Sequence, residues 1–355
     1  MGSRIVVATI AASLIFPAVS GSAPRTLGNG CCDQIWSITP AGKQRKQLLF
    51  NTIERQWLVF DLSPDRRRIV FWACIRPSEY CVDGSLFTAS VSGQHTRAIV
   101  MHVGVTAAQW SPDGKRILFA KNATYCCPGP TQLAVVSANG TGLRTVVTCA
   151  FCDTGVWAPD SRRIAYVESV ESAGPSPEFF LKVKDVSATQ NRVVAQVQGN
   201  GIDLSWSPGG RWLAYYEISK PARGRVLRVV RLDGKRNHTV GNLAEAATPY
   251  AWSPDGRRLA FVGPRGLTIA NLDGSHRRLL DRYRPFGASC CGPAWSPNGR
   301  EIAYFRSTSS TSVDERGNLT LIAPNARARR KLTQTFYTDK IFWARDGRRI
   351  YYAAR

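Results

Sequence analysis

The sequence predicts an all-β protein, a seven-bladed β-propeller of four-stranded antiparallel blades. Three observations predict it. One short motif recurs along the chain, the residues of that motif suit a tight β-turn, and the two chain ends resemble complementary halves of one blade. A repeat of about 40 to 50 residues is typical of propeller blades.

The motif has the form Trp-Ser-Pro-Asp-Gly, and successive copies start 48, 47, 49, 46, 43 and 48 residues apart. The copies begin at Leu62, Trp110, Trp157, Trp206, Trp252, Trp295 and Trp343. Pro presets the backbone at the first central turn position, and Gly supplies the left-handed residue that closes the turn. Because the first copy has Arg66 in place of Gly, we expect its turn to have a different geometry.

Each turn leads into a short apolar strand, such as Ile164–Tyr166 or Leu259–Phe261. The small Ala in the middle of these strands suits a crowded contact between neighbouring sheets, where the Trp rings of the motif would also be buried. A second, weaker hairpin follows, as in Leu133–Val147. Two hairpins make one four-stranded blade, whose strands we call A to D from the centre outward.

The chain ends predict how the ring closes. The hairpin Ile35–Leu48 is of the second kind, whereas the hairpin Ile341–Tyr352 at the other end is of the first kind. Side by side they would complete blade seven, so that residues 35–355 form a closed propeller. Closure removes the free sheet edges that promote aggregation.

The first residues predict export. Ile5–Phe16 is uncharged, and Ala18 and Ser20 are small residues at positions suited to cleavage, so residues 1–20 resemble a signal peptide. A short membrane anchor is the alternative, but the apolar stretch is shorter than the about 20 residues that span a bilayer. Residues 21–34 would form a leader segment that carries Cys31 and Cys32. We expect a periplasmic or extracellular location.

Ten cysteines are candidates for disulfide bonds, because an even count in an exported chain favours pairing. They are Cys31, Cys32, Cys74, Cys81, Cys126, Cys127, Cys149, Cys152, Cys290 and Cys291. All of them fall in the B–C and D–A connections, which share one face of a propeller. This face is either a loop surface made rigid for binding or a set of stapled loops.

Proximity suggests particular pairs among these cysteines. We expect Cys126 and Cys127 to bond to Cys149 and Cys152, and Cys74 to bond to Cys81. The alternative is a zinc site formed by the thiolates of Cys126, Cys127, Cys149 and Cys152.

The opposite face, which carries the A–B and C–D turns, is predicted to be basic. The chain has 47 Lys and Arg against 25 Asp and Glu, a formal net charge of +22. The A–B turns hold Arg66, Arg67, Arg68, Lys115, Arg116, Arg162, Arg163, Arg257, Arg258, Arg348 and Arg349. The C–D turns add Lys43, Arg45, Lys46, Lys235, Arg236, Arg277, Arg278, Arg327, Arg329, Arg330 and Lys331. Such a face would attract an anionic polymer; a solvated turn face without a ligand is the alternative.

Motifs of catalysis are missing from the sequence. The four histidines, His95, His102, His238 and His276, fall in C–D turns or after a D strand. There is no nucleophile elbow, no phosphate-binding glycine loop and no zinc-binding His-Glu-x-x-His motif. Acidic residues near the starts of A strands, Asp153, Asp203 and Asp339, could face the channel and hold a cation, or simply line it. We assign no catalytic, cofactor-binding or metal-binding residue.

The motif, extended to Trp-Ser-Pro-Asp-Gly-Lys/Arg-x-Ile/Leu-Ala-Phe/Tyr, resembles the repeat of TolB-type propellers. Trp110, Pro112, Asp113, Gly114 and their equivalents carry the resemblance, which covers essentially the whole chain after the signal peptide. It implies the propeller fold, and TolB itself is a periplasmic protein that binds other envelope proteins. TolB has an N-terminal α/β domain and six blades, whereas this chain shows seven repeats and no such domain. Similar propellers cap serine peptidases of the prolyl oligopeptidase family.

Two functions fit these observations. The first is a non-catalytic binding or scaffold protein, monomeric and without a cofactor, that recognises an envelope or extracellular protein, peptide or glycan and does not bind nucleic acid specifically. The second is a propeller enzyme of the lactonase or lyase type that uses channel carboxylates and a divalent cation. A cluster of Asp, Glu, Asn or His side chains on several A strands would favour the second.

Overall fold

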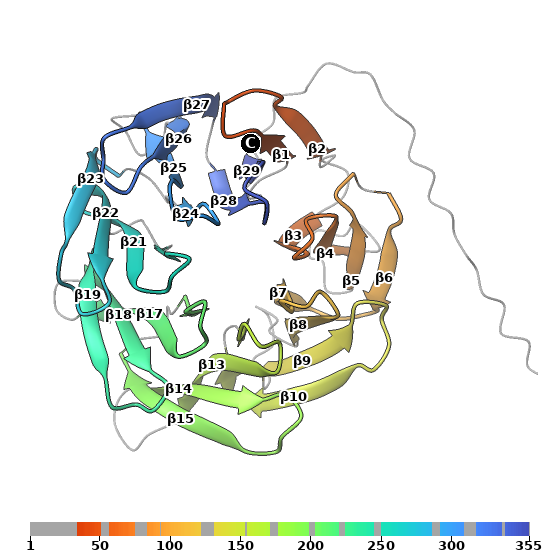
Figure 1. Cartoon of the computed structure of the whole chain (residues 1–355). Coiled ribbons are helices and arrows are strands. Elements are labelled where there is room, and N and C mark those ends of the chain that lie inside the picture. Colours follow the sequence, from red (N-terminus) through yellow and green to blue (C-terminus); the bar gives the residue numbers. More distant parts are fainter. Residues whose placement is uncertain are drawn as a thin grey trace, which may run out of the picture. The chain divides into compact units, whose positions relative to one another are not determined.

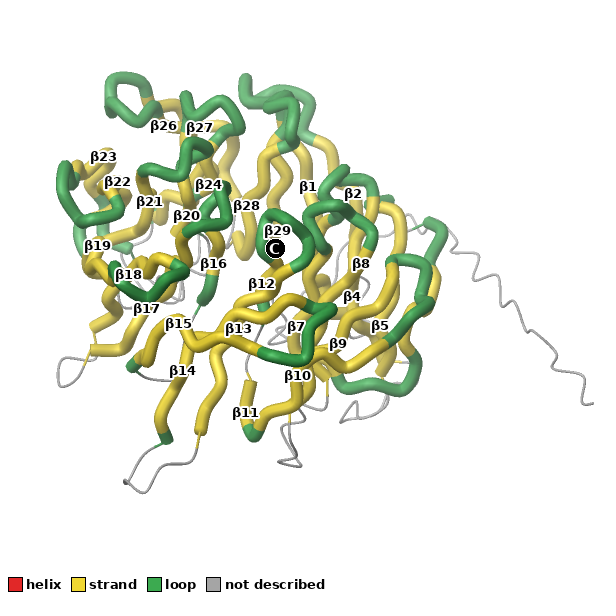
Figure 2. Tube along the Cα trace, turned by 60° about the horizontal axis from the view of Figure 1, so that its bottom comes forward, coloured by secondary structure: helices red, strands yellow, loops and turns green. Residues whose placement is uncertain are grey.

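The structure is a computed structural model, and it shows strands and turns without helices over the residues that it describes (Figure 1, Figure 2). The described residues are 34–50, 57–74, 84–92, 94–121, 131–152, 155–170, 177–198, 203–219, 224–244, 250–285, 292–308, 317–335 and 338–354. Within them, no helix is long and apolar enough to cross a membrane. The predicted signal peptide and the predicted leader segment lie outside them, except for Gln34, the last residue of that segment.

Seven antiparallel sheets are arranged as the blades of a propeller, which confirms the predicted fold (Figure 1). Blade 1 contains β3 (Trp57–Leu62), β4 (Arg68–Cys74), β5 (Gly84–Ser90) and β6 (Arg97–Val100). Blade 2 contains β7 (Val105–Trp110), β8 (Arg116–Lys121), β9 (Thr131–Ser137) and β10 (Arg144–Cys149). Blade 3 contains β11 (Phe151–Cys152), β12 (Val156–Trp157), β13 (Arg163–Val170), β14 (Glu178–Asp185) and β15 (Asn191–Val197). Blade 4 contains β16 (Ser205–Trp206), β17 (Trp212–Ser219), β18 (Gly224–Arg231) and β19 (Asn237–Leu243).

The remaining blades follow the same order. Blade 5 contains β20 (Tyr250–Trp252), β21 (Arg258–Gly263), β22 (Gly266–Asn271) and β23 (Arg278–Arg282). Blade 6 contains β24 (Ala294–Trp295), β25 (Ile302–Ser307), β26 (Gly317–Ile322) and β27 (Arg329–Thr335). Blade 7 contains β28 (Thr338–Trp343), β29 (Ile350–Ala354), β1 (Gln34–Ile38) and β2 (Lys46–Phe50), two strands from each end of the chain.

Blade 7 closes the ring in the predicted manner. Its strands are ordered β2-β1-β29-β28, so the two chain ends pair at the middle of the sheet. The register between β1 and β29 runs without interruption from Gln34 opposite Ala354 to Ile38 opposite Ile350. Because this sheet is continuous, neither terminal hairpin leaves a free edge between blades 6 and 1.

Blade 3 departs from the four-strand plan at its inner edge. The A strand is split into β11 and β12, and both parts pair with β13. Cys152 is opposite Glu168 in the first part, and Trp157 is opposite Ile164 in the second. The interruption falls where the chain enters the blade from β10, and the A–B turn that follows keeps the form of the other blades.

The motif forms its turn through the Ser and Asp side chains. In blade 2, Ser111 Oγ donates to Asp113 Oδ1 at 2.6 Å and accepts from the backbone N–H of Arg116 at 2.9 Å. The N–H of Gly114 donates to the carbonyl of Ser111 at 2.8 Å, and Gly114 has a φ of 69°. These bonds explain why the motif joins Ser, Asp and Gly at fixed offsets.

The expectation of a different turn in the first copy is wrong. Arg66 has a φ of 60°, and its N–H donates to the carbonyl of Ser63 at 2.8 Å, which matches the geometry at Gly114. The hydrogen bonds of Ser63 and Asp65 hold the turn in this form, so Arg66 adopts the left-handed conformation that Gly occupies in other copies.

A substitution in these turns tests the role of the left-handed residue. Gly256 has a φ of 67°, so Gly256→Val should lower the free energy of unfolding by about 1–3 kcal/mol through backbone strain. Gly209 is the matched control, because it lies in an equivalent turn and a Cβ there would meet nothing within 4 Å. Gly209→Val should cost about 0.5 kcal/mol or less. Equal costs for the two variants, measured by urea denaturation, would contradict this account.

The core lies between the blades. The Trp residues at the ends of the A strands pack against the blade that precedes them. Trp110, for example, belongs to one apolar cluster with Val70 and Leu86 of blade 1. Five of them are buried, and Trp252 is half-buried. The buried members are Trp110, Trp157, Trp206, Trp295 and Trp343. Since each ring removes a large apolar area from water, these residues join neighbouring sheets.

Candidate functional site

The A–B turns form the innermost connections of the blades, and they share a cation at one position. Five residues after the first residue of the motif, each of the seven copies has an exposed Lys or Arg. These residues, which we call the cation ring, are Arg67, Lys115, Arg162, Arg211, Arg257, Arg300 and Arg348. Five of these residues were predicted from the sequence as part of the basic face, whereas Arg211 and Arg300 were not. The constant offset from the start of the motif was the signal that could have found them.

The residue that follows the ring cation contacts the neighbouring blade instead. In four blades it is an Arg whose guanidinium lies over the Trp ring of the following blade. Arg68 lies 4.5 Å from the ring centroid of Trp110, and Arg258 lies 5.2 Å from that of Trp295. Arg116 and Arg163 make the same contact with Trp157 and Trp206. Cation–π contacts of this kind are attractive, so part of the predicted basic face joins the blades rather than awaiting a ligand.

Several cations of the C–D turns are also engaged with neighbouring elements. Arg278 Nη2 donates to the carbonyl of Asn325 at 2.6 Å, and Arg277 Nη2 donates to that of Val240 at 2.8 Å. Arg45 Nε donates to the Tyr352 hydroxyl at 2.8 Å. The structure therefore divides the predicted basic face into cations that bind other parts of the propeller and the exposed cation ring.

The Asp side chains of the turns stay ionised beside the cation ring. Partial burial would raise the pKa of Asp113, but the hydrogen bonds from Ser111 and the Lys115 N–H and the charges of Arg116 and Lys115 outweigh it, so the pKa lies below its usual value. Asp65 and Asp255 show the same balance and the same direction. Each of these carboxylates is occupied by its own turn, whereas the ring cation beside it extends from the turn into solvent.

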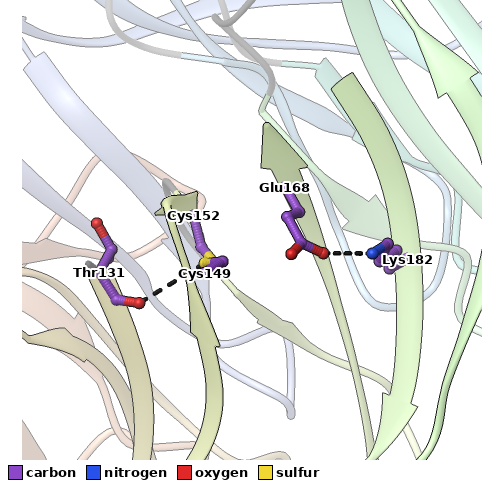
Figure 3. The surroundings of a disulfide bond; sticks show 5 residues. All are labelled: Thr131, Cys149, Cys152, Glu168 and Lys182. Carbon is purple, nitrogen blue, oxygen red and sulfur yellow. Dashed lines mark hydrogen bonds and ion pairs between the residues drawn. A yellow bond between two sulfur atoms is a disulfide. The ribbon is translucent and has the colours of Figure 1, made fainter. Parts of the chain in front are cut away.

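Cys149 and Cys152 form a disulfide on the opposite face, with their Cα atoms 5.9 Å apart (Figure 3). Cys149 ends β10 of blade 2 and Cys152 lies in β11 of blade 3, so the bond fixes the connection between two blades. This differs from the expected bonds to Cys126 and Cys127, because the turn between β10 and β11 brings the two nearer cysteines together. The same pair is thereby removed from the zinc alternative.

The other cysteine predictions fall on residues whose side chains are not described. They concern Cys31, Cys32, Cys74, Cys81, Cys126, Cys127, Cys290 and Cys291.

Beside the disulfide, Lys182 of β14 donates to Glu168 of β13 in a mostly buried ion pair (Figure 3). This pair joins adjacent strands of blade 3, and we assign it a structural role.

The predicted channel carboxylates do not assemble into a site within the described residues. Asp203 is exposed, and its backbone carbonyl accepts a hydrogen bond from the Tyr250 hydroxyl at 2.6 Å. Asp153 and the side chain of Asp339 lie outside the described part. Over that part, no group of three or more His, Cys, Asp or Glu residues is close enough to hold a metal ion. His276 hydrogen-bonds within its own C–D turn, to Asn271 and Ser275.

Comparison with known proteins supports the fold. No protein-family model matches the chain, and no curated protein matches its sequence. A propeller assigned as TolB from Agrobacterium tumefaciens superimposes with a TM-score of 0.54 at 14% identity, over 92% of this chain and 99% of that one. The chain has the fold of TolB-like propellers.

Enzymes share the same fold. An oligogalacturonate lyase in complex with manganese gives a TM-score of 0.63 at 12% identity, over 92% of this chain and 98% of that one. Puromycin hydrolase gives 0.57 at 14% identity, over 80% of this chain but 48% of the hydrolase. At such identities the likeness concerns the fold, since one fold hosts many functions.

Proposed function

We propose that the chain is an exported, non-catalytic binding protein whose cation ring binds an anionic partner, an envelope or extracellular protein, peptide or glycan. The observation that carries this proposal is the cation at one position of all seven A–B turns. The turn itself does not require a cation there, because the Ser, Asp and Gly bonds involve only the backbone of that residue.

The ring cations are also available for a ligand. Among the described residues, Arg162 is the ring member that pairs with a carboxylate, Asp185 at 3.7 Å, and its side chain is 75% exposed. Such an exposed pair is worth little, so a ligand can replace it. Cations repeated around one face attract anionic chains over a long range, and binding releases the counterions of those chains.

Binding of a fluorescent polyglutamate peptide tests the proposal. Arg67→Gln, Arg211→Gln and Arg257→Gln together should weaken binding about 10-fold or more, because each exposed cation contributes a fraction of a kcal/mol or more. The slope of log affinity against log salt should also become shallower.

A triple variant on the other face is the matched control. Lys121 and Arg282 end β8 and β23, and Arg265 lies in the turn between β21 and β22. All three are on the B–C and D–A side, and their change to Gln lowers the net charge equally. The control should bind polyglutamate like the wild type. If both variants lose affinity to the same extent, attraction is a property of total charge and the cation ring is not the binding face.

The enzyme alternative has a separate test. A lyase that uses a divalent cation needs several ligands at the centre of the propeller, and the described residues do not supply such a group. We therefore expect manganese to leave the melting temperature unchanged. A saturable rise would favour the enzyme and would direct attention to Asp153 and Asp339.

A further inference from the structure

Two arginines depart from the repeat in adjacent blades. Arg66 of blade 1 takes the place that Gly holds in five other copies, and Arg345 of blade 7 takes the place that Pro holds in six. The equivalent prolines are Pro64, Pro112, Pro159, Pro208, Pro254 and Pro297. Because these copies form the same turn with a neutral residue, the turn itself explains neither arginine.

Both side chains leave their own blade. Arg345 Nη2 donates to the carbonyl of Pro112 at 3.1 Å, so it extends from the inner turn of blade 7 to that of blade 2. The Arg66 guanidinium lies 4.9 Å from the ring centroid of Phe342, so it extends from blade 1 to blade 7. The two side chains therefore run in opposite directions across the inner turns of blades 7, 1 and 2, and they are near enough for the charge of Arg345 to act on Arg66.

Arg66 is held at a cost to the fold. Its φ of 60° is a strained conformation for a side chain with a Cβ. Its Nε–H is buried and has no hydrogen-bond partner in the described part of the chain. Burial lowers the pKa of Arg66, the charge of Asp61 raises it, and the neighbouring charge of Arg345 lowers it again. Strain, an unpaired buried donor and like-charge repulsion occur together here, as they do at functional sites.

We propose that Arg66 and Arg345 form a subsite for an oxyanion that carries two negative charges, such as a phosphate or sulfate group. Guanidinium groups bind such oxygens through charge-assisted hydrogen bonds, and the free Nε–H of Arg66 supplies a donor. Two adjacent cations favour a dianion over a single carboxylate, because a dianion neutralises both. The inference rests on the proposed function, since the group would belong to the anionic partner or be a free ion that competes with it.

Variants that restore the repeat give a direct test. Arg66→Gly and Arg345→Pro supply the residues that other copies have at these turns, so the double variant should fold at least as stably as the wild type. It should bind inorganic phosphate at least about 10-fold more weakly, as measured by calorimetry at constant ionic strength. Lys121→Gln with Arg282→Gln removes the same charge from the opposite face, at the ends of β8 and β23, and should leave phosphate binding unchanged.

The choice of anion tests the subsite further. Phosphate and sulfate should bind, whereas acetate and dimethyl phosphate, which carry one charge, should bind at least about 10-fold more weakly. Phenyl phosphate separates the two sources of the group: binding equal to that of phosphate indicates a subsite open to a group on a partner, and failure to bind indicates a site for the free ion.

Three results would overturn the inference: no phosphate binding by the wild type, equal binding by the double variant, or equal loss in the control on the opposite face. If the wild type still binds polyglutamate in any of these cases, the proposed function is unaffected.

Discussion

A chain that ends at Lys340 should fail to fold. The deletion removes β29 and the last residues of β28, the two inner strands of blade 7. β1 would lose its pairing along the whole stretch from Gln34 to Ile38, and the buried side chains of Ile350 and Tyr352 would be lost from the core. The remaining hairpin β1–β2 cannot form a stable sheet alone, and blade 6 would expose its packing face. We expect aggregation on expression and no cooperative thermal transition.

A permuted chain supplies the control for this deletion. Ala354 lies directly opposite Gln34 in the register of blade 7, so a short glycine-rich linker can join residue 354 to residue 34 as an ordinary B–C connection. Moving residues 338–354 to the front in this way restores all four strands of the blade, and the permuted chain should melt cooperatively. A truncated chain that keeps the melting temperature of the full chain would show that blade 7 does not close the ring.

The fold could be predicted from the sequence because the turn, the number of blades and the closure of the ring each correspond to a pattern in the sequence. The motif that begins at Trp110 contains the side chains of one turn, and its spacing gives the number of blades. The half-blades at the two ends then fix the closure, since β1 and β29 have no other strand to complete their sheet. No distant contact had to be known for these steps.

The candidate site was harder to predict because its parts depend on contacts between blades. Arg68 and Arg67 are adjacent in sequence, yet one lies over Trp110 and the other points to solvent, a division that appears only when blades 1 and 2 are placed together. Likewise, nothing in the sequence near Arg345 indicates that it contacts Pro112. The Cys149–Cys152 bond was mispredicted for a related reason, since the path of the chain between β10 and β11 decides it.

A polar network centred on a buried carboxylate lies between blades 5 and 6. Like the candidate site, it joins residues that are far apart in the sequence. Asp281 of β23 accepts hydrogen bonds from the Tyr304 hydroxyl at 2.7 Å and from Arg306 Nε at 2.9 Å, both on β25. It also pairs with Arg329 of β27. Burial raises the pKa of Tyr304, and the hydrogen bond and charge of Asp281 raise it further, so the hydroxyl remains a donor at neutral pH.

Replacing Asp281 should therefore destabilise the protein strongly. Asp281 is 5% exposed, and Asp281→Ala leaves the buried Tyr304 hydroxyl and two arginines without their shared acceptor. Removing one member of a buried ion pair costs about 3–5 kcal/mol. Because the two arginines are partly exposed to water, we expect a loss at the lower end, about 3 kcal/mol, in the free energy of unfolding measured by urea denaturation.

Two further variants show whether the network is the cause. Tyr304→Phe removes one hydrogen bond and should cost about 1 kcal/mol in the wild type, but it should cost less, or even stabilise, in the Asp281→Ala background, because the buried hydroxyl has already lost its acceptor there. Asp233→Ala breaks an exposed pair with Arg231, whose nitrogen lies 3.4 Å from the carboxylate, and should cost about 1 kcal/mol or less. If Asp281→Ala is no more costly than Asp233→Ala, or if the effects at Asp281 and Tyr304 are additive, the network does not join blades 5 and 6 in the way described, and apolar packing alone accounts for that seam.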